Sequence, residues 1–68
     1  MTAREIIDNA SYDEVKDGFY NLINAQGCFG DFVGYLEDNG CAEYVREYMT
    51  QKMLKDCSKE DIKEEFNF

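Results

Sequence analysis

The sequence predicts an all-α protein, a compact bundle of four to five short helices that forms a single domain over residues 1–68. Apolar residues recur with helical spacing in successive segments, and residues typical of helix N-caps precede several of these segments. The chain contains no proline, and Asn39-Gly40 is a turn signal between two periodic segments. Hydrophobic residues make up 44% of the chain, which is enough for one small core but leaves no room for a second domain.

Two capping boxes mark the starts of the first two predicted helices. Thr2 and Glu5 precede a short helix over about residues 3–9, and Ser11 and Glu14 precede the second helix. In such a box the hydroxyl accepts a backbone N–H bond while the carboxylate three residues later reaches back to the cap. The second helix carries one apolar face with the spacing i, i+4, i+7 and i+8, formed by Val15, Phe19, Leu22 and Ile23.

Four glycines bear on the second and third predicted helices. Gly27 is placed where a left-handed C-cap would end the second helix. Gly18 lies inside that helix at a cost of up to about 1 kcal/mol relative to Ala, so it either permits close packing or weakens the first turns.

Gly30 and Gly34 lie one turn apart on the flank of a third helix over residues 28–38. They cost it up to about 2 kcal/mol together, unless another backbone packs there. The inner face of this helix is expected to be Phe29, Phe32, Val33 and Leu36.

Two further helices are predicted after the turn. The fourth runs over about residues 41–55, and Arg46, Lys52 and Lys55 balance its acidic charge. Its inner stripe is Ala42, Val45, Met49 and Met53, with Tyr44 and Tyr48 at the edge. Ser58 caps a short final helix that ends near Glu65, and Phe66 and Phe68 are expected to pack onto the bundle.

Charge and composition restrict the partner and the compartment. Fifteen acidic and seven basic residues give a net charge of −8, and residues 1–40 alone carry −6. This charge repels phosphate backbones and anionic membranes, so we expect no direct nucleic-acid binding, no membrane attachment and a partner protein with a basic surface. An odd number of cysteines and the lack of a secretory signal predict a cytoplasmic protein, in the host cytoplasm if the chain is phage-encoded.

The residue types argue against catalysis and against a metal or other cofactor. The chain has no histidine, which removes the commonest general base and the Ser-His and Cys-His nucleophile pairs. Cys28, Cys41 and Cys57 lack the close spacing of a zinc site, and buried free cysteine is the expected role. A calcium loop starting at Asp13 fails because Val15 takes a ligand position. A cysteine-dependent metal or redox switch stays as a minor alternative.

The candidate site is an acidic surface that also carries tyrosines. Carboxylates can imitate rows of phosphates in a basic cleft, and tyrosine buries much area at small entropic cost. Solubility is the competing explanation, and Asp13, Glu14, Glu60 and Asp61 also favour helix starts through the helix dipole. The acidic candidates are Asp8, Asp13, Asp17, Asp31, Glu37, Asp38, Glu43 and Glu47, and the aromatic candidates are Tyr12, Tyr35 and Tyr44.

These features predict a non-enzymatic binding protein, an inhibitor or regulator that occupies a basic site on its partner. Small size, acidity and aromatic content together resemble phage-encoded inhibitors of host proteins, which implies a host nucleic-acid enzyme or defence complex as the target and DNA mimicry as one means. Residues 64–68, Glu-Glu-Phe-Asn-Phe, resemble the acidic, Phe-ended tails by which bacterial single-stranded DNA-binding proteins recruit partners. The alternative is a small assembly subunit, such as a homodimer, that associates through the flank at Gly30 and Gly34.

Overall fold

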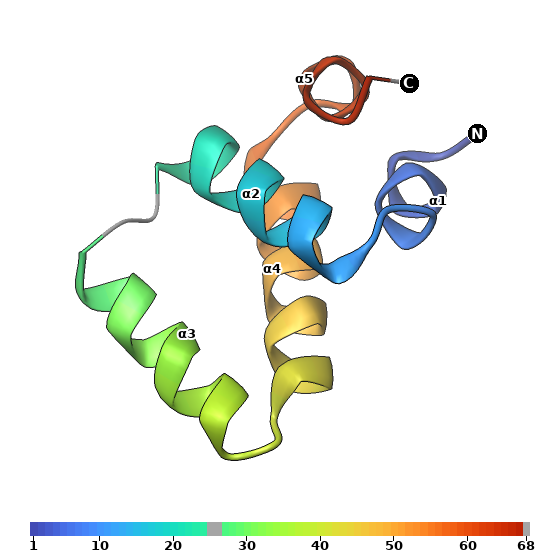
Figure 1. Ribbon diagram of the computed structural model, residues 1–68. Coiled ribbons are helices and arrows are strands. Elements are labelled where there is room, and N and C mark those ends of the chain that lie inside the picture. Colours follow the sequence, from blue (N-terminus) through green and yellow to red (C-terminus); the bar gives the residue numbers. More distant parts are fainter. Residues whose placement is uncertain (25–26, 68) are drawn as a thin grey trace.

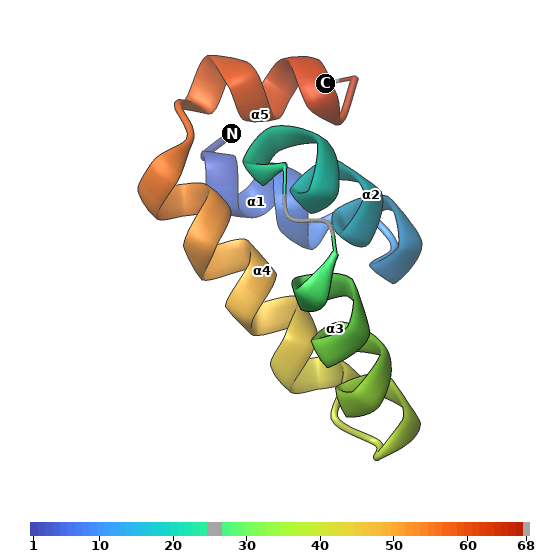
Figure 2. The same ribbon diagram turned by 90° about the vertical axis from the view of Figure 1, so that its left-hand side faces the viewer.

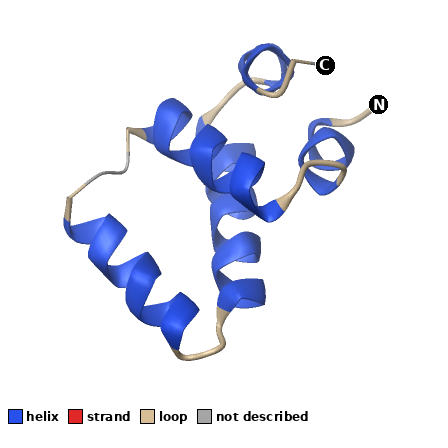
Figure 3. Cartoon of the chain, in the orientation of Figure 1, coloured by secondary structure: helices blue, strands red, loops and turns tan. Residues whose placement is uncertain are grey.

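The computed structural model describes residues 1–24 and 27–67, and within them the secondary structure is entirely helical (Figures 1 and 3). The all-α fold predicted from the sequence is confirmed. The side chain of Cys28 and the whole of Phe68 lie outside the described part, so their predicted packing is not addressed. The described helices are α1 (Ala3–Asp8), α2 (Tyr12–Ile23), α3 (Cys28–Asp38), α4 (Ala42–Asp56) and α5 (Lys59–Glu65).

Side-chain caps start three of these helices, as the sequence predicts. The Thr2 hydroxyl accepts the backbone N–H of Glu5 at 3.2 Å, and the Glu5 carboxylate accepts the backbone N–H of Thr2 at 2.9 Å. Ser11 and Glu14 form the same reciprocal pair at α2. Ser58 accepts the backbone N–H of Asp61 at the start of α5. Each cap satisfies N–H groups that have no partner within the helix.

The end of α2 differs from the prediction. The helix ends at Ile23, and Asn24 takes the left-handed conformation with φ 58° and ψ 40°. Asparagine is among the few residues other than glycine that adopt this conformation readily, so α2 stops before Gly27 is reached. Gly27 instead precedes α3 with φ 79°. The predicted C-cap at Gly27 is therefore wrong.

Helix α4 is the central helix of the fold. α1, α2 and α5 gather around one end of it, whereas α3 runs antiparallel to its N-terminal half and forms a hairpin with it (Figures 1 and 2). All five helices contribute to the core, but unequally. The fully buried apolar side chains are Ile6, Ile7, Val15, Phe19, Val33, Val45, Met49, Met53 and Ile62.

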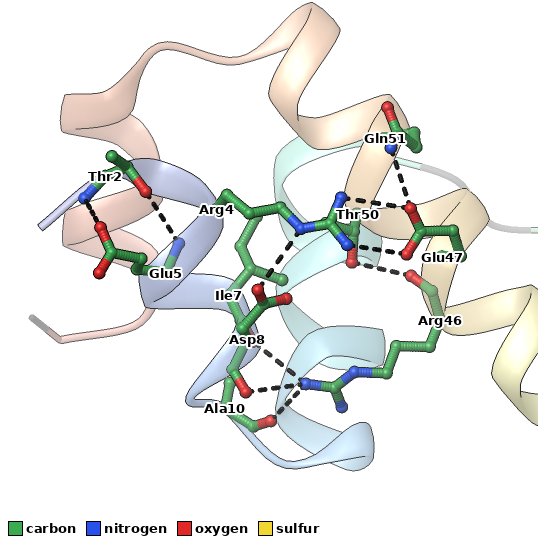
Figure 4. Close-up of polar contacts among 10 residues, drawn as sticks. All are labelled: Thr2, Arg4, Glu5, Ile7, Asp8, Ala10, Arg46, Glu47, Thr50 and Gln51. Carbon is green, nitrogen blue, oxygen red and sulfur yellow. Dashed lines mark hydrogen bonds and ion pairs between the residues drawn. The ribbon is translucent and has the colours of Figure 1, made fainter.

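Two arginines attach α1 to α4 (Figure 4). One nitrogen of the Arg46 guanidinium donates to the carbonyl oxygens of Ile7, Asp8 and Ala10 at 3.2, 3.3 and 2.8 Å. These carbonyls lie at and just beyond the C-terminus of α1, where the helix leaves its acceptors unpaired and favours positive charge. Arg4 makes a two-pronged contact with the Glu47 carboxylate at 3.2 and 2.9 Å. A six-residue helix is thus held at both of its ends.

Gly18 permits close packing, which is the first of the two roles that the sequence allowed for it. The Phe66 ring lies against it, and a Cβ added at Gly18 would come within 2.6 Å of the ring. Phe66 therefore packs onto the bundle as predicted. Gly30 and Gly34 differ from Gly18. A Cβ at Gly30 would meet only the Tyr20 hydroxyl at 3.9 Å, and one at Gly34 would meet no described atom within 4 Å.

Candidate partner-binding surface

Large aromatic side chains lie exposed on α3 and α4. Among the described residues, Phe32 is 50% exposed, Tyr35 65%, Tyr44 62% and Tyr48 43%. Phe32 and Tyr35 are three residues apart on α3, and Tyr44 and Tyr48 are four residues apart on α4, so each pair lies on one side of its helix. The exposure is therefore concentrated along one side of each helix.

Contacts around Phe29 place these two helix sides next to each other. The Phe29 ring lies 6.2 Å from Phe32 on its own helix and 5.6 Å from Tyr48 on α4, with an interplanar angle of 27° to Tyr48. Phe29 also lies 5.2 Å from the buried ring of Phe19. Exposed rings on two helices are thus supported by a ring that packs against the core.

The opposite side of the hairpin is covered by α2. Lys16 of α2 contacts both carboxylate oxygens of Glu37 on α3 at 3.1 Å, and the Tyr20 hydroxyl approaches Gly30. Lys16 and Tyr20 of α2 thus reach the part of α3 that carries Glu37 and Gly30, whereas Phe32 and Tyr35 lie on a different side of that helix. We call Phe32, Tyr35, Tyr44 and Tyr48 the aromatic face.

Carboxylates border the aromatic face. Asp31 and Asp38 lie one turn before and one turn after Tyr35 on α3, and Glu43 is the residue before Tyr44 in the first turn of α4; all three are exposed. None of them forms an ion pair or side-chain hydrogen bond with another described residue. We call these three residues the acidic rim.

Basic residues are scarce around this surface. The chain has no Lys or Arg from Asp17 to Val45, so α3 and the first turn of α4 carry only negative charge. Lys52, one turn beyond Tyr48, is paired with Asp56 at 2.9 Å. The acidic rim therefore keeps its negative charge available.

The other five predicted acidic residues do not belong to the acidic rim, because they are either paired with a basic residue or located on α2. Asp8 and Glu47 pair with Arg4 at 3.4 and 2.9 Å. Hydrogen bonds from Gln51 and then Arg4 lower the pKa of Glu47. Glu37 pairs with Lys16, whereas Asp13 and Asp17 are exposed on α2. The eight predicted carboxylates are thus spread over four helices, and three of them are used in intramolecular ion pairs.

Tyr12 does not belong to an exposed surface. Its side chain packs against the core, and its hydroxyl is buried without a hydrogen bond of ordinary geometry to another described residue. Burial, and then the nearby Glu37 carboxylate, raise the pKa of Tyr12. The approach of this hydroxyl and of Lys16 lowers the pKa of Glu37. Tyr12 therefore stabilises the α2–α3 junction instead of offering a ring to a partner.

Two members of the aromatic face were missed from the sequence. The spacing of apolar residues predicts Phe32 on the inner face of its helix. In the structure Phe32 is half exposed, and Val33 is the fully buried residue of α3 among the described side chains. Tyr48 was placed at the edge of its helix but was not selected as a binding residue. Its position four residues after Tyr44 was the available signal, since that spacing places both rings on one side of a helix.

Other surfaces offer weaker chemistry. An open hollow of about 450 Å³ is lined by Leu22, Asp61, Glu64 and Glu65. Glu65 accepts a hydrogen bond from Asn21 at 3.0 Å. Within residues 1–24 and 27–67, no three His, Cys, Asp or Glu side chains are grouped so that they could hold a metal ion.

Comparison with known proteins yields no relative. No protein-family profile, curated protein or solved structure matches the chain. In the part of the chain that the structure describes, none of the helices has the length and apolar character needed to cross a bilayer.

Proposed function

We propose that this protein is a non-enzymatic binding protein that docks the aromatic face and its acidic rim onto a basic site of a partner protein. The observation that carries the proposal is the exposure of four aromatic side chains on two adjacent helices. Exposed aromatic area of this kind is typical of protein-binding surfaces, where Tyr and Phe supply buried area in the bound state.

The charge of the chain supports a basic partner. A net charge of −8, with no base from Asp17 to Val45, attracts a positive surface and repels nucleic acid. Because the acidic residues are spread over several helices, they favour steering of the partner over imitation of a row of phosphates. Occupation of a basic site on an enzyme or nucleoprotein complex would make the protein an inhibitor or regulator, in line with the phage-type role expected from the sequence.

A second candidate is a small assembly subunit. Gly34 has no described atom within 4 Å of the position that a Cβ would occupy, so the flank is open at Gly34, whereas the Tyr20 hydroxyl reaches it at Gly30. A helix of a second copy could pack there and add to the small core. Sedimentation at high protein concentration tests this candidate, and a strict monomer would contradict it.

The proposed function is tested by affinity capture with matched variants. Tyr35→Ser/Tyr44→Ser removes two exposed rings, and Asp13→Asn/Asp17→Asn serves as a control that removes two charges from α2. Both changes lie at exposed positions, so each fold should be retained, as far-ultraviolet circular dichroism can show.

We expect one or more proteins from a lysate of the source cell to be retained by the wild type and by the control variant and to be lost from the tyrosine variant. Quantitative mass spectrometry measures the difference. Retention of the same proteins by all three chains would contradict a role for the aromatic face.

A further inference from the structure

We infer that the aromatic face recognises arginine side chains of the partner, with guanidinium groups stacked on the tyrosine rings and paired with carboxylates of the acidic rim. This inference rests on the proposed function and names the chemistry of the partner segment. It commits to arginine, as distinct from positive charge in general. Three properties of the surface carry it: supported rings, free carboxylates and the lack of competing cations.

Two of the four rings, those of Phe32 and Tyr48, are supported from beneath. Phe29 contacts both Phe32 and Tyr48, and it lies 5.2 Å from Phe19, which is fully buried. A series of ring contacts thus runs from the core to the surface. A ring whose position is already restricted loses less entropy when a ligand stacks on it, so such a platform suits planar groups.

The carboxylates are free to pair with a ligand. Asp31, Asp38 and Glu43 are exposed and form no ion pair with a described residue. A guanidinium group presents five N–H donors in a planar fork and can donate two of them to one carboxylate while its face lies on an aromatic ring. Asp31 and Asp38 therefore each lie within one turn of Tyr35 on a helix that carries only negative charge, which is the combination that arginine uses.

Arginine fits this surface better than lysine does. The guanidinium is planar and weakly hydrated and stacks on rings, whereas the lysine ammonium is a compact, strongly hydrated point charge. Cation–π contact contributes about 0.5–1 kcal/mol at an exposed site, which is roughly a twofold to fivefold gain in affinity per contact. Lysine also makes cation–π contacts, so the preference for arginine is only part of this gain at each contact and grows with the number of arginines in the partner segment.

A second copy of this chain is a poorer occupant of the face. Two copies would bring two acidic rims together, with no Lys or Arg between Asp17 and Val45 to offset them. Like charges opposed across an interface are repulsive, and the rings alone would have to overcome this repulsion. The charge complement of the face is a basic segment.

The test is a nuclear magnetic resonance titration of the ¹⁵N-labelled full chain with two peptides. Each probe is a twelve-residue Gly/Ser peptide with four basic residues, all arginine in one and all lysine in the other. We expect the arginine peptide to shift amide signals at the aromatic face and to bind at least about fivefold more tightly than the lysine peptide.

Two triple variants separate local recognition from net charge. Asp31→Asn/Asp38→Asn/Glu43→Gln neutralises the acidic rim, and Asp13→Asn/Asp17→Asn/Glu64→Gln neutralises three carboxylates elsewhere. Both variants have the same net charge. We expect the rim variant to lose most of its affinity for the arginine peptide and the control variant to keep most of it. Tyr35→Leu/Tyr44→Leu/Tyr48→Leu keeps apolar area but should remove the preference for arginine.

The possible results separate the inference from the proposed function. Equal affinity for the two peptides at the aromatic face would overturn the arginine inference and leave a basic partner as the proposed function. Shifts confined to α2 and α5 would overturn both. Dilution-dependent shifts of the aromatic face without peptide would assign it to a second copy and would also overturn both.

Discussion

Helices α1 and α3 are held in the fold in different ways, and the shorter one is held more firmly. α1 has six residues, of which Ile6 and Ile7 are buried, and it begins with a capping box. α3 has eleven residues and begins after Gly27, which provides no side-chain cap. Among its described side chains only Val33 is fully buried.

This difference shows where the molecule can carry a binding surface. Weakly buried elements open more readily and leave side chains free, and binding surfaces are often drawn from such regions. α1 uses its side chains and its terminal carbonyls for contacts with the rest of the fold. α3 leaves Phe32 and Tyr35 exposed instead, and so supplies half of the aromatic face. The predictions that follow test this contrast in order of expected effect.

The largest expected effect comes from removing the contact that holds the C-terminus of α1. Arg46→Met keeps much of the aliphatic packing but deletes the donor to the carbonyls of Ile7, Asp8 and Ala10. Hydrogen bonds from charged groups contribute about 1.5–3 kcal/mol, so we expect the free energy of unfolding to fall by about 2 kcal/mol. Urea unfolding followed by circular dichroism measures the change.

Lys55→Met on the same helix is the matched control for Arg46→Met. Lys55 is exposed and forms no ion pair with another described residue, so this variant should stay within about 0.5 kcal/mol of the wild type. Equal effects of the two substitutions would show that α1 does not depend on Arg46.

A pair of glycine substitutions should give effects of opposite sign. Gly18→Ala places a Cβ within 2.6 Å of the Phe66 ring, so the ring must move, and we expect a net loss of about 1 kcal/mol. Gly34→Ala meets no described atom within 4 Å, and the better helix propensity of Ala should raise stability by up to about 1 kcal/mol. Thermal unfolding of both variants checks the signs. A destabilising Gly34→Ala would mean that the flank of α3 is occupied.

The smallest expected effect is the pH dependence of the α2–α3 junction. Tyr12 and Lys16 hold the pKa of Glu37 below its ordinary value of 4.5. A group with a lowered pKa stabilises the fold fully above its ordinary value, and this contribution is lost as the pH falls through the lowered value. The wild type should therefore unfold roughly 2–5 °C above Glu37→Gln at pH 7, and the difference should vanish as the pH falls through the lowered pKa of Glu37. A difference that is independent of pH would exclude the ion pair as its source.

Most of the secondary structure could be predicted from the sequence because its causes are local. The boxes at Thr2 and Ser11 and the cap at Ser58 depend on residues within one turn, and all three are present in the structure. The end of α2 was mispredicted even though its cause is local. Asn24 and Gly27 can both adopt the left-handed conformation, and Asn24 comes first in the chain.

The candidate site depended on contacts that sequence spacing does not contain. Helical periodicity predicts both Phe32 and Val33 on the inner face. The packing of α3 against its neighbouring helices decides that Val33 is buried and Phe32 is half exposed. In the same way, the predicted set of eight acidic residues was divided by tertiary partners, since Arg4 and Lys16 reach carboxylates on other helices. Tyr12 was removed from the surface by burial of its hydroxyl against the core.

The sequence by itself determined that this protein is helical, acidic and rich in exposed charge, because helix caps, periodicity and net charge are properties of neighbouring residues or of the whole chain. Only the tertiary structure decided which rings and carboxylates are free. Among the described residues, the docking of α1, α2 and α5 around α4 uses eight of the nine fully buried apolar side chains and the ion pair between Arg4 and Glu47. The antiparallel α3–α4 hairpin keeps exposed aromatic rings and carboxylates without an ion-pair partner among the described residues. Whether a side chain is buried or paired depends on helices that are distant in the sequence, so the sequence pattern alone could not decide it.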